Sequence, residues 1–379
     1  MSGITRKCEM KTEGCEMDLT RIIEPLCSWY DRSKRDLPWR KDQDPYHVWV
    51  SEIMLQQTRV EAVKSFYRRF LQELPTVEDL ACCEEDRLMK LWEGLGYYSR
   101  VRNMQTAARQ IMEEYGGNFP DTREKLLKLK GIGAYTAGAV ASIAFNEPVA
   151  AVDGNVLRVI TRLEKDPRDI MKQSVRTEFD RRITEALEKT CGGSVTSSSF
   201  NQGMMDLGAG VCLPNAAPLC GKCPLASFCS AHEAGVEMDY PKKKAAKPRR
   251  IEGRTVLLIR DGDRILIRKR GKKGLLAGLW EFPNPEGHLE PEAALSFASG
   301  LGLEPVHIRA LAPAKHVFSH IEWHMTGYEI RVASLGEEAE PPYVLIDEEQ
   351  VRREYAIPTA FSAYYNWLAD HRQNTEQDV

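Results

Sequence analysis

A change in the spacing of apolar residues near the basic segment 240–250 constrains the fold of this chain more than any other feature. Upstream of that segment, apolar side chains recur at the spacing of one helix face, in one stretch after another. Downstream, short runs rich in Val, Ile and Tyr follow the period of two that is typical of strands. The sequence therefore predicts a multidomain protein, with an all-α domain followed by a small α+β domain.

The expected elements can be stated by range. Helices are expected at 19–32, 46–74, 84–91, 101–115, 123–129, 136–145, 156–163 and 176–189, and later at 291–299 and 360–370. Strands are expected at 254–260, 264–269, 306–311, 317–323, 325–332 and 342–346. The predicted domain order is an N-terminal extension (1–18), a helical domain (19–240), a basic linker (241–252), an α+β domain (253–370) and a tail (371–379).

Charge and hydropathy limit the kinds of partner. The net charge is -3, yet residues 241–252 contain six basic residues and one acidic residue, so a polyanion would be bound by local patches and backbone amides. No apolar run reaches the roughly 18 residues of a membrane span, and the N-terminus is too polar for a signal peptide. A monomer without a membrane partner is expected, cytoplasmic in location and nucleoid-associated if the source is prokaryotic.

Four cysteines crowd into residues 212–229 of the helical domain, at Cys212, Cys220, Cys223 and Cys229. Four thiolates form a complete tetrahedral set, which suits either zinc or an iron–sulfur cluster. Structural zinc sites usually pair two C-x2-C units and this segment has one, so the asymmetry favours a cluster, although spacing alone does not decide. Either group would hold a loop in place without a catalytic role.

A tight turn, Gly131-Ile-Gly133, joins two predicted helices. The first N–H groups of the second helix lack partners within the helix, and glycine allows a phosphate to approach them closely. Lys128 and Lys130 lie beside the turn. A plain corner between two helices has the same sequence, so the phosphate site and the corner are equally good interpretations.

Two carboxylates stand out by their surroundings. Glu52 shares a helix face with Val48 and Trp49, and a carboxyl desolvated there would have a raised pKa suited to general-acid work. Asp153 is an N-cap for the helix beginning near Val156, where the pKa of a carboxyl stays low. One protonated and one ionised carboxyl is the pair that cleaves glycosidic bonds. Composition alone favours structural roles for both.

Several motifs together are more specific than any one of them. In order along the chain, the motifs and the four cysteines resemble those of MutY-type adenine DNA glycosylases, of the helix-hairpin-helix or endonuclease III superfamily, and they lie at 29–40, 51–60, 92–103, 129–137, 152–156 and 212–229. The resemblance covers about residues 20–370. It implies a helix-hairpin-helix glycosylase core with a [4Fe-4S] cluster loop, joined to a MutT-like (Nudix-like) C-terminal domain.

The resemblance also implies catalytic roles. Glu52 would protonate the adenine that is excised, and Asp153 would stabilise the oxocarbenium sugar as a transient covalent partner. Asn155 and Tyr135 would position the site. The four cysteines would bind the [4Fe-4S] cluster.

The implied partner is double-stranded DNA that contains an 8-oxoguanine:adenine or guanine:adenine mismatch. A target base must leave the duplex to reach such a pocket. By resemblance, Arg40 and Gln202 would line the adenine pocket. Gln57 and Tyr97 would wedge into the base stack.

Position 135 separates two reactions. The related endonuclease III type has a lysine there, whose amine can form a Schiff base with the sugar and cut the strand. This chain has Tyr135, so it is expected to remove the base by hydrolysis without an efficient lyase step. The alternatives are a bifunctional pyrimidine-lesion glycosylase and lyase, and a non-catalytic lesion-binding protein of the same fold.

The C-terminal domain resembles MutT hydrolases through residues 278–283. In those enzymes a helix supplies several glutamates for Mg²⁺, but the corresponding residues 295–302 contain no carboxylate. Because catalysis with a hard cation needs those oxygens, the domain is expected to be a reader of the lesion.

Histidines recur at every fourth position of residues 316–324, which by itself suggests a metal stripe. The Val, Phe, Ile and Trp content of the segment favours a strand instead. Phe318, Ser319 and His320 match the family loop that recognises 8-oxoguanine, and this interpretation is favoured over metal, with a plain strand end as the remaining alternative.

Overall fold

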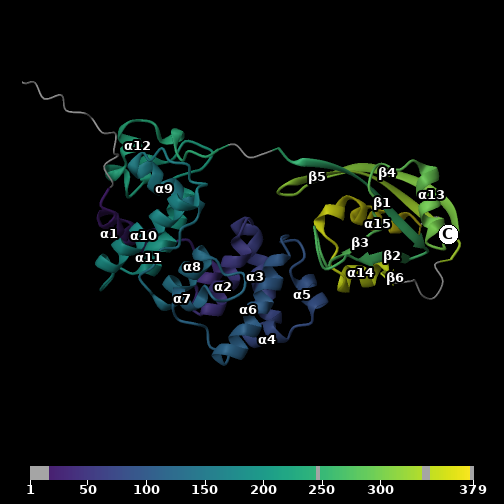
Figure 1. The fold of residues 1–379 in the computed structure, drawn as a ribbon, viewed down its shortest axis with the longest axis horizontal. Helices are drawn as coiled ribbons and strands as arrows, with labels where there is room; N and C mark the ends of the chain where they lie inside the picture. The colour runs from purple at the N-terminus through teal and green to yellow at the C-terminus, as the bar shows by residue number, and fades with distance from the viewer. Residues whose placement is uncertain (1–16, 245–247, 335–341, 376–379) are drawn as a thin grey trace, which may run out of the picture. The chain divides into compact units, whose positions relative to one another are not determined.

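The computed structural model describes residues 17–244, 248–334 and 342–375, which form two compact units (Figure 1). Within these residues, unit 1 comprises 17–71, 75–81 and 103–244, and unit 2 comprises 72–74, 82–102, 248–334 and 342–375. Most of the predicted extension (1–18) lies outside the described residues, whereas residues 371–375 of the predicted tail (371–379) belong to the last helix.

Unit 1 is helical, as its apolar periodicity predicts. Its α-helices are α1 (Thr20–Ser33), α2 (Pro45–Leu55), α3 (Val60–Glu73), α4 (Val77–Cys82), the C-terminal part of α6 (Ser99–Tyr115), α7 (Arg123–Leu126), α8 (Ala134–Phe145), α9 (Gly154–Glu164), α10 (Gln173–Thr190), α11 (Ser197–Gly210) and α12 (Ser230–Glu233), with 3-10 turns η1 (Pro38–Arg40), η2 (Cys220–Lys222), η3 (Ala226–Phe228) and η4 (Glu237–Asp239). The single helix expected at 46–74 is wrong, since the chain breaks it between α2 and α3. Helix α11 was not predicted.

The core that supports the site is formed by α1, α9, α10 and α11. Helix α1 buries Ile22, Leu26 and Tyr30, which recur every four residues on one face. Phe179 of α10 and Phe200 of α11 complete this core. Helix α11 packs against α1, α8 and α9, so it is a central helix despite its polar sequence.

Unit 2 contains a six-stranded mixed sheet. Its strands are β1 (Arg250–Asp261), β2 (Arg264–Lys269), β3 (Trp280–Glu281), β4 (Pro305–Val317), β5 (Ile321–Val332) and β6 (Tyr343–Asp347). The order is β3-β2-β1-β5-β4, with β6 also paired to β2; β1 and β5 run parallel and the other pairs are antiparallel.

Two layers of helices cover this sheet. Val256 and Leu258 of β1 face α14 (Glu348–Glu354) and α15 (Ser362–Thr375), whereas Leu257 and Ile259 face α13 (Pro291–Gly300) (Figure 1). The short helix α5 (Glu85–Leu91) also belongs to unit 2. The sequence predicts the α+β class correctly but misses β3 and α14.

Two predicted boundaries change. The strand expected at 317–323 is wrong, because β4 ends at Val317 and β5 begins at Ile321. The turn between them is closed by the Phe318 N–H, which donates to the Ile321 carbonyl at 2.8 Å. The basic linker is also shorter than predicted, since β1 begins at Arg250.

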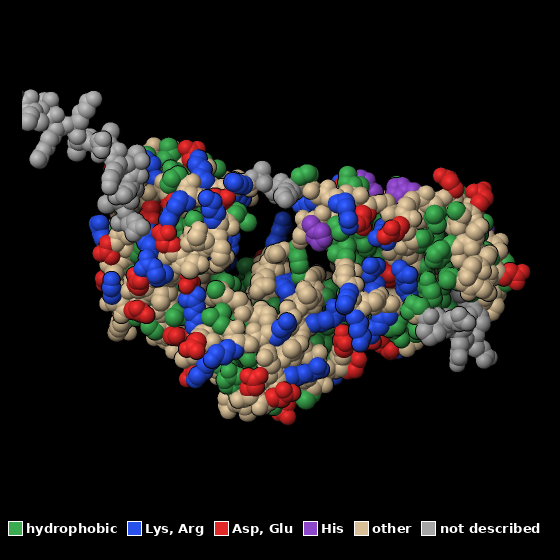
Figure 2. Space-filling view, viewed as in Figure 1, with side chains coloured by type: hydrophobic (Ala, Val, Ile, Leu, Met, Phe, Trp, Pro, Cys, Tyr) green, Lys and Arg blue, Asp and Glu red, His purple; other side chains and the backbone are tan. Residues whose placement is uncertain are grey.

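The surface has mixed charge. On the face drawn in Figure 2, basic and acidic side chains are interspersed over both units. Along the described part of the chain, none of the helices is both long enough and apolar enough to cross a bilayer.

Candidate active site

One cavity of about 270 Å³ in unit 1 gathers most of the predicted site. Its walls include six predicted residues from α2, α8, the start of α9, η1 and α11: Glu52, Tyr135, Asp153, Asn155, Arg40 and Gln202. Residues that lie more than 150 positions apart in the sequence therefore meet at one site.

Glu52 is held in an apolar wall of this cavity. It lies on α2, and only 4% of the residue is exposed. Burial raises the pKa of Glu52 to about 7; the hydrogen bond from Tyr135 opposes this, and the charge of Asp153 adds to it. The Tyr135 hydroxyl donates to Glu52 Oε2 at 2.6 Å. The expectation of a raised pKa is confirmed.

Asp153 caps α9 as predicted. Its Oδ1 accepts the backbone N–H groups of Asn155 and Val156, both at 2.8 Å, and its Oδ2 accepts the Asn155 side-chain amide at 2.7 Å. The expectation that this cap keeps a low pKa is wrong. Burial raises the pKa of Asp153 and outweighs the lowering effect of these three hydrogen bonds.

Arg158, which the sequence analysis missed, connects the Asp153 cap to the cysteine loop. Its guanidinium donates to Asn155 Oδ1 and to the carbonyls of Gly208 and Cys212, each at 2.8 Å. A Cβ at position 208 would lie 2.5 Å from the Asn155 Cβ, so glycine is needed for α11 to approach α9 here. The sequence around Arg158 does not reveal this role, because two of its three partners, Gly208 and Cys212, lie about 50 residues away along the chain.

Asp206, also missed, fixes the position of Arg40. Arg40 donates through both terminal nitrogens to the Asp206 carboxylate, at 2.8 and 2.9 Å, and its guanidinium lies 5.4 Å from the centre of the Tyr30 ring. Arg35 forms a second ion pair with Asp206 at 2.5 Å. Burial opposes ionisation, but the hydrogen bonds and charges of both arginines hold the pKa of Asp206 below its ordinary value.

We expect Asp206→Asn to lower the thermal stability and the activity together. The substitution would leave Arg40 buried without its charge partner, at a cost on the order of 3 kcal/mol in the free energy of unfolding. Calorimetry measures this against Asp36→Asn, which removes an exposed ion pair with Lys41 and should change little. Equal stability of the two variants would contradict a clamping role for Asp206.

The predicted hairpin turn lies between α7 and α8, although α7 ends at Leu126 and not at residue 129, where the predicted helix ends. Gly131 has a φ of +77°, and a Cβ there would lie 2.5 Å from the Asn103 Cβ, so glycine is required. Gly133 is the N-cap residue of α8 and has no side chain to cap it, and both glycines are exposed. The turn thus presents backbone N–H groups at an exposed helix start.

The four cysteines surround one small cavity together with Arg162 and Val211. They are free of disulfides. Arg162 donates to Cys212 Sγ at 3.2 Å, and Cys220 Sγ donates to Glu237 Oε1 at 3.5 Å. His232 also lies near Cys220, but its Nδ1 is 2.6 Å from Glu237 Oε1. Four converging sulfurs fit a metal or cluster with soft ligands.

Gln57 and Tyr97 share an uncommon backbone conformation. Their φ angles are +62° and +47°, in the left-handed region that non-glycine residues seldom adopt. Gln57 is exposed, and 47% of Tyr97 is exposed. Such strain is often stored at functional sites.

The turn between β4 and β5 contacts Tyr97 within unit 2. The hydroxyls of Tyr97 and Ser319 are 3.1 Å apart. The Phe318 ring packs edge-on against Trp323, with centres 4.9 Å apart, and His320 is exposed. The His316 ring packs against Phe318, with centres 4.6 Å apart. The packing against Phe318 explains the position of the His316 ring, so a metal is not needed to explain it.

Comparisons with known proteins identify the family of this chain. Residues 50–194 match the HhH-GPD superfamily of base excision DNA repair proteins, and residues 255–367 match the NUDIX domain. The adenine DNA glycosylase of Rattus norvegicus is 35% identical, over 94% of this chain and 80% of its own length. That of Schizosaccharomyces pombe is 33% identical, over 72% and 70% respectively.

A solved structure of a thermostable thymine-DNA glycosylase is 29% identical, with a TM-score of 0.49, over 56% of this chain and 96% of its own. The two family matches fall on the helical unit and on the unit with the sheet, and the rat relative aligns over 94% of the chain. The chain therefore belongs to the adenine DNA glycosylases of base excision repair, with an HhH-GPD domain followed by a NUDIX domain.

Proposed function

We propose that this glycosylase excises adenine mispaired with 8-oxoguanine or guanine in duplex DNA, by hydrolysis of the N-glycosidic bond and without cutting the strand. The observation that carries the proposal is the pair of carboxyls in one cavity, Glu52 buried and Asp153 partly buried, with Tyr135 hydrogen-bonded to Glu52. A base that is stacked within the duplex cannot reach carboxyls in such a cavity, so the target adenine must be flipped out.

Glu52 acts as the general acid. With a pKa of about 7, a large part of the protein holds this carboxyl protonated at neutral pH. Tyr135 donates to Oε2, which makes this oxygen the acceptor and leaves Oε1 to carry the proton. Transfer of that proton to a ring nitrogen of adenine weakens the bond to the sugar.

Asp153 stabilises the positive charge that develops on the sugar as the base leaves. Burial disfavours the ionised form, but three N–H donors and Arg158 favour it. Asn155 orients the carboxylate through its amide. The same carboxylate can bond transiently to the sugar carbon before water completes hydrolysis, as in retaining glycosidases.

Adenine is recognised by Arg40 and Gln202, which line the cavity beside Glu52. The clamp on Arg40 keeps its guanidinium in place without the base, which lowers the cost of binding. Gln57 and Tyr97, with their strained backbone, wedge into the space that the flipped base leaves.

The duplex is held by backbone contacts as well. The exposed turn at Gly131 and Gly133 binds one phosphate of the DNA backbone.

Phe318, Ser319 and His320 contact the 8-oxoguanine opposite the adenine. The NUDIX domain is a reader, because α13 contains no carboxylate beyond Glu292 in its first turn.

The four cysteines would hold a [4Fe-4S] cluster, and Arg162 donates a hydrogen bond to the Sγ of one of these proposed ligands, Cys212. The cluster, when bound, staples the loop 212–229 through its iron–thiolate bonds. The Cys212 carbonyl of this loop accepts a hydrogen bond from Arg158, and Arg158 in turn donates to Asn155 Oδ1, so the loop helps to hold Asn155 in place.

We expect the purified protein to contain iron and acid-labile sulfide in equal amounts, and Cys223→Ser to lose both. Elemental analysis and the visible absorption of the cluster measure this. Cys191→Ser changes a half-buried thiol outside the loop and is the matched control. Zinc in place of iron would contradict the cluster.

The deciding experiment is single-turnover base release from duplexes with adenine opposite 8-oxoguanine, guanine or thymine. We expect release from the first two and an intact strand until alkaline treatment, because Tyr135 offers no amine for a Schiff base. Strand cleavage without alkali would favour the glycosylase and lyase alternative. No release from any duplex would favour a lesion-binding protein.

A further inference from the structure

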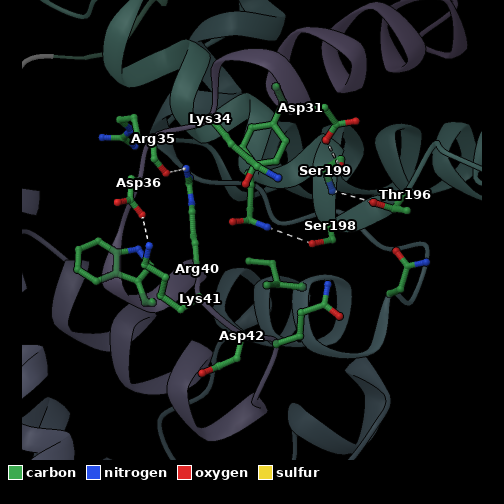
Figure 3. A pocket seen from close by; sticks show the side chains of 16 residues that line it. Asp31, Lys34, Arg35, Asp36, Arg40, Lys41, Asp42, Thr196, Ser198 and Ser199 are labelled. Atoms are coloured by element: carbon green, nitrogen blue, oxygen red, sulfur yellow. Dashed lines mark hydrogen bonds and ion pairs between the residues drawn. The ribbon is translucent and has the colours of Figure 1, made fainter.

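Unit 1 has a second cavity (Figure 3), which shares lining residues with the active-site cavity. It is lined by residues of 30–43, by the end of α8 and by residues 196–202 at the start of α11, and it is called the antechamber below. Its volume is about 710 Å³, against about 270 Å³ for the active-site cavity. That size lies within the roughly 300–1,000 Å³ of small-molecule sites.

Five residues line both cavities and form the partition between them: Arg35, Trp39, Arg40, Ile143 and Gln202. The partition has a fixed part and a part that is free to move. Arg40 is held by two charge-assisted hydrogen bonds to Asp206. The Gln202 amide donates one neutral hydrogen bond, to Ser198 Oγ at 3.0 Å, which is weaker. A rotation of Gln202 would therefore open the partition at little cost.

The chemistry of the antechamber suits a neutral heterocycle rather than a phosphate. Its cations are largely paired, with Lys41 on Asp36 at 2.5 Å, and with Arg35 and Arg40 on Asp206. Tyr30 and Trp39 are the aromatic residues among its lining, and the nearly buried rings make part of the wall apolar. Hydroxyls from the start of α11, such as Ser199, supply donors and acceptors. A free purine base needs this combination.

We propose that the antechamber is the exit path of the excised base: free adenine passes Gln202 into the antechamber while the abasic product still covers the opening through which the base entered. This proposal rests on the proposed base flipping. A base released into a closed pocket under bound DNA needs a second way out, and the antechamber adjoins that pocket on the side of Gln202.

The test uses the full protein and a mismatched duplex labelled in the adenine base, under single-turnover conditions. Ser199→Trp places a large ring in the antechamber, and Ser28→Trp makes the same change at an exposed position of α1 that does not line it. One sample is denatured to measure the total base cleaved. A parallel native sample is passed rapidly through a desalting column to measure the base retained with the complex.

We expect all three proteins to cleave at the same rate, while Ser199→Trp releases the free base about tenfold more slowly than wild type and Ser28→Trp. Asp31→Trp, at an exposed lining position, gives the same retention if Ser199→Trp folds poorly. Equal escape from all variants, or slower cleavage in Ser199→Trp, overturns the exit path. Absence of cleaved base in denatured wild-type samples instead overturns the proposed function.

Discussion

Glu52→Gln is expected to reduce single-turnover release of adenine by roughly 10²–10⁴-fold, the usual contribution of a general acid. Glutamine keeps the size of the side chain and still accepts the Tyr135 hydroxyl, so the cavity should be unchanged. It has no acidic proton to transfer. Rapid quench measurements on the 8-oxoguanine:adenine duplex, at saturating protein, report this step.

Two further measurements separate chemistry from folding. Because the reaction needs the protonated form of Glu52, the wild-type rate should fall as pH rises through about 7. The folded pKa of Glu52 lies above its unfolded value, so ionisation destabilises the folded protein as pH rises, and Glu52→Gln should be at least as stable at alkaline pH. Glu61→Gln, at an exposed position of α3, is the matched control. A rate in Glu52→Gln that equals the control would remove Glu52 from the mechanism.

Asp153→Asn is expected to reduce base release by roughly 10²–10³-fold, as when one electrostatic stabiliser of a transition state is removed. Asparagine is also a good N-cap, so α9 should keep its start. What is lost is the negative charge beside the sugar. The measurement is the same single-turnover assay, with duplex binding measured in parallel to show that the DNA still docks.

Asp44 provides a matched control for this substitution. It caps α2 through the backbone N–H groups of Tyr46 and His47, much as Asp153 caps α9. Asp44→Asn therefore repeats the change of cap without touching the cavity. If both variants lost activity equally, the effect would come from capping and not from charge at the sugar.

The sequence predicted the parts of the site that depend on local pattern. The apolar neighbours of Glu52 correctly indicated burial and a raised pKa, and Asp153 was correctly placed as an N-cap. Its pKa was wrong in direction, because the helix start is local whereas the burial of Asp153 comes from α2, α8 and α11 packed around it. Tertiary burial has no signature in the residues next to Asp153.

Asp206 and Arg158 were missed for a related reason. Each is a charged residue on a helix, and a charged side chain there normally faces water, although both have apolar neighbours in the sequence. Helix α11 itself went unpredicted because it contains Ser, Asn and three Gly, which are poor helix formers. It is helical because Phe200, Met204 and Leu207 are buried against α1, α8 and α9. The strands of unit 2 were easier to predict, because successive side chains of a strand such as β1 point alternately to the two faces of the sheet, and each face has its own core.

Substitutions at different positions of α11 should affect different properties of the protein, which matters for inherited variation. Ser199 faces the antechamber, Gln202 the partition, Asp206 the arginine clamp and Gly208 the cap of α9. Neighbouring codons of one short gene segment thus affect product escape, base recognition, stability and catalytic geometry in turn. Missense alleles clustered there should divide into biochemically distinct classes, so a single activity assay would group together defects that differ in origin and in the remedy they need.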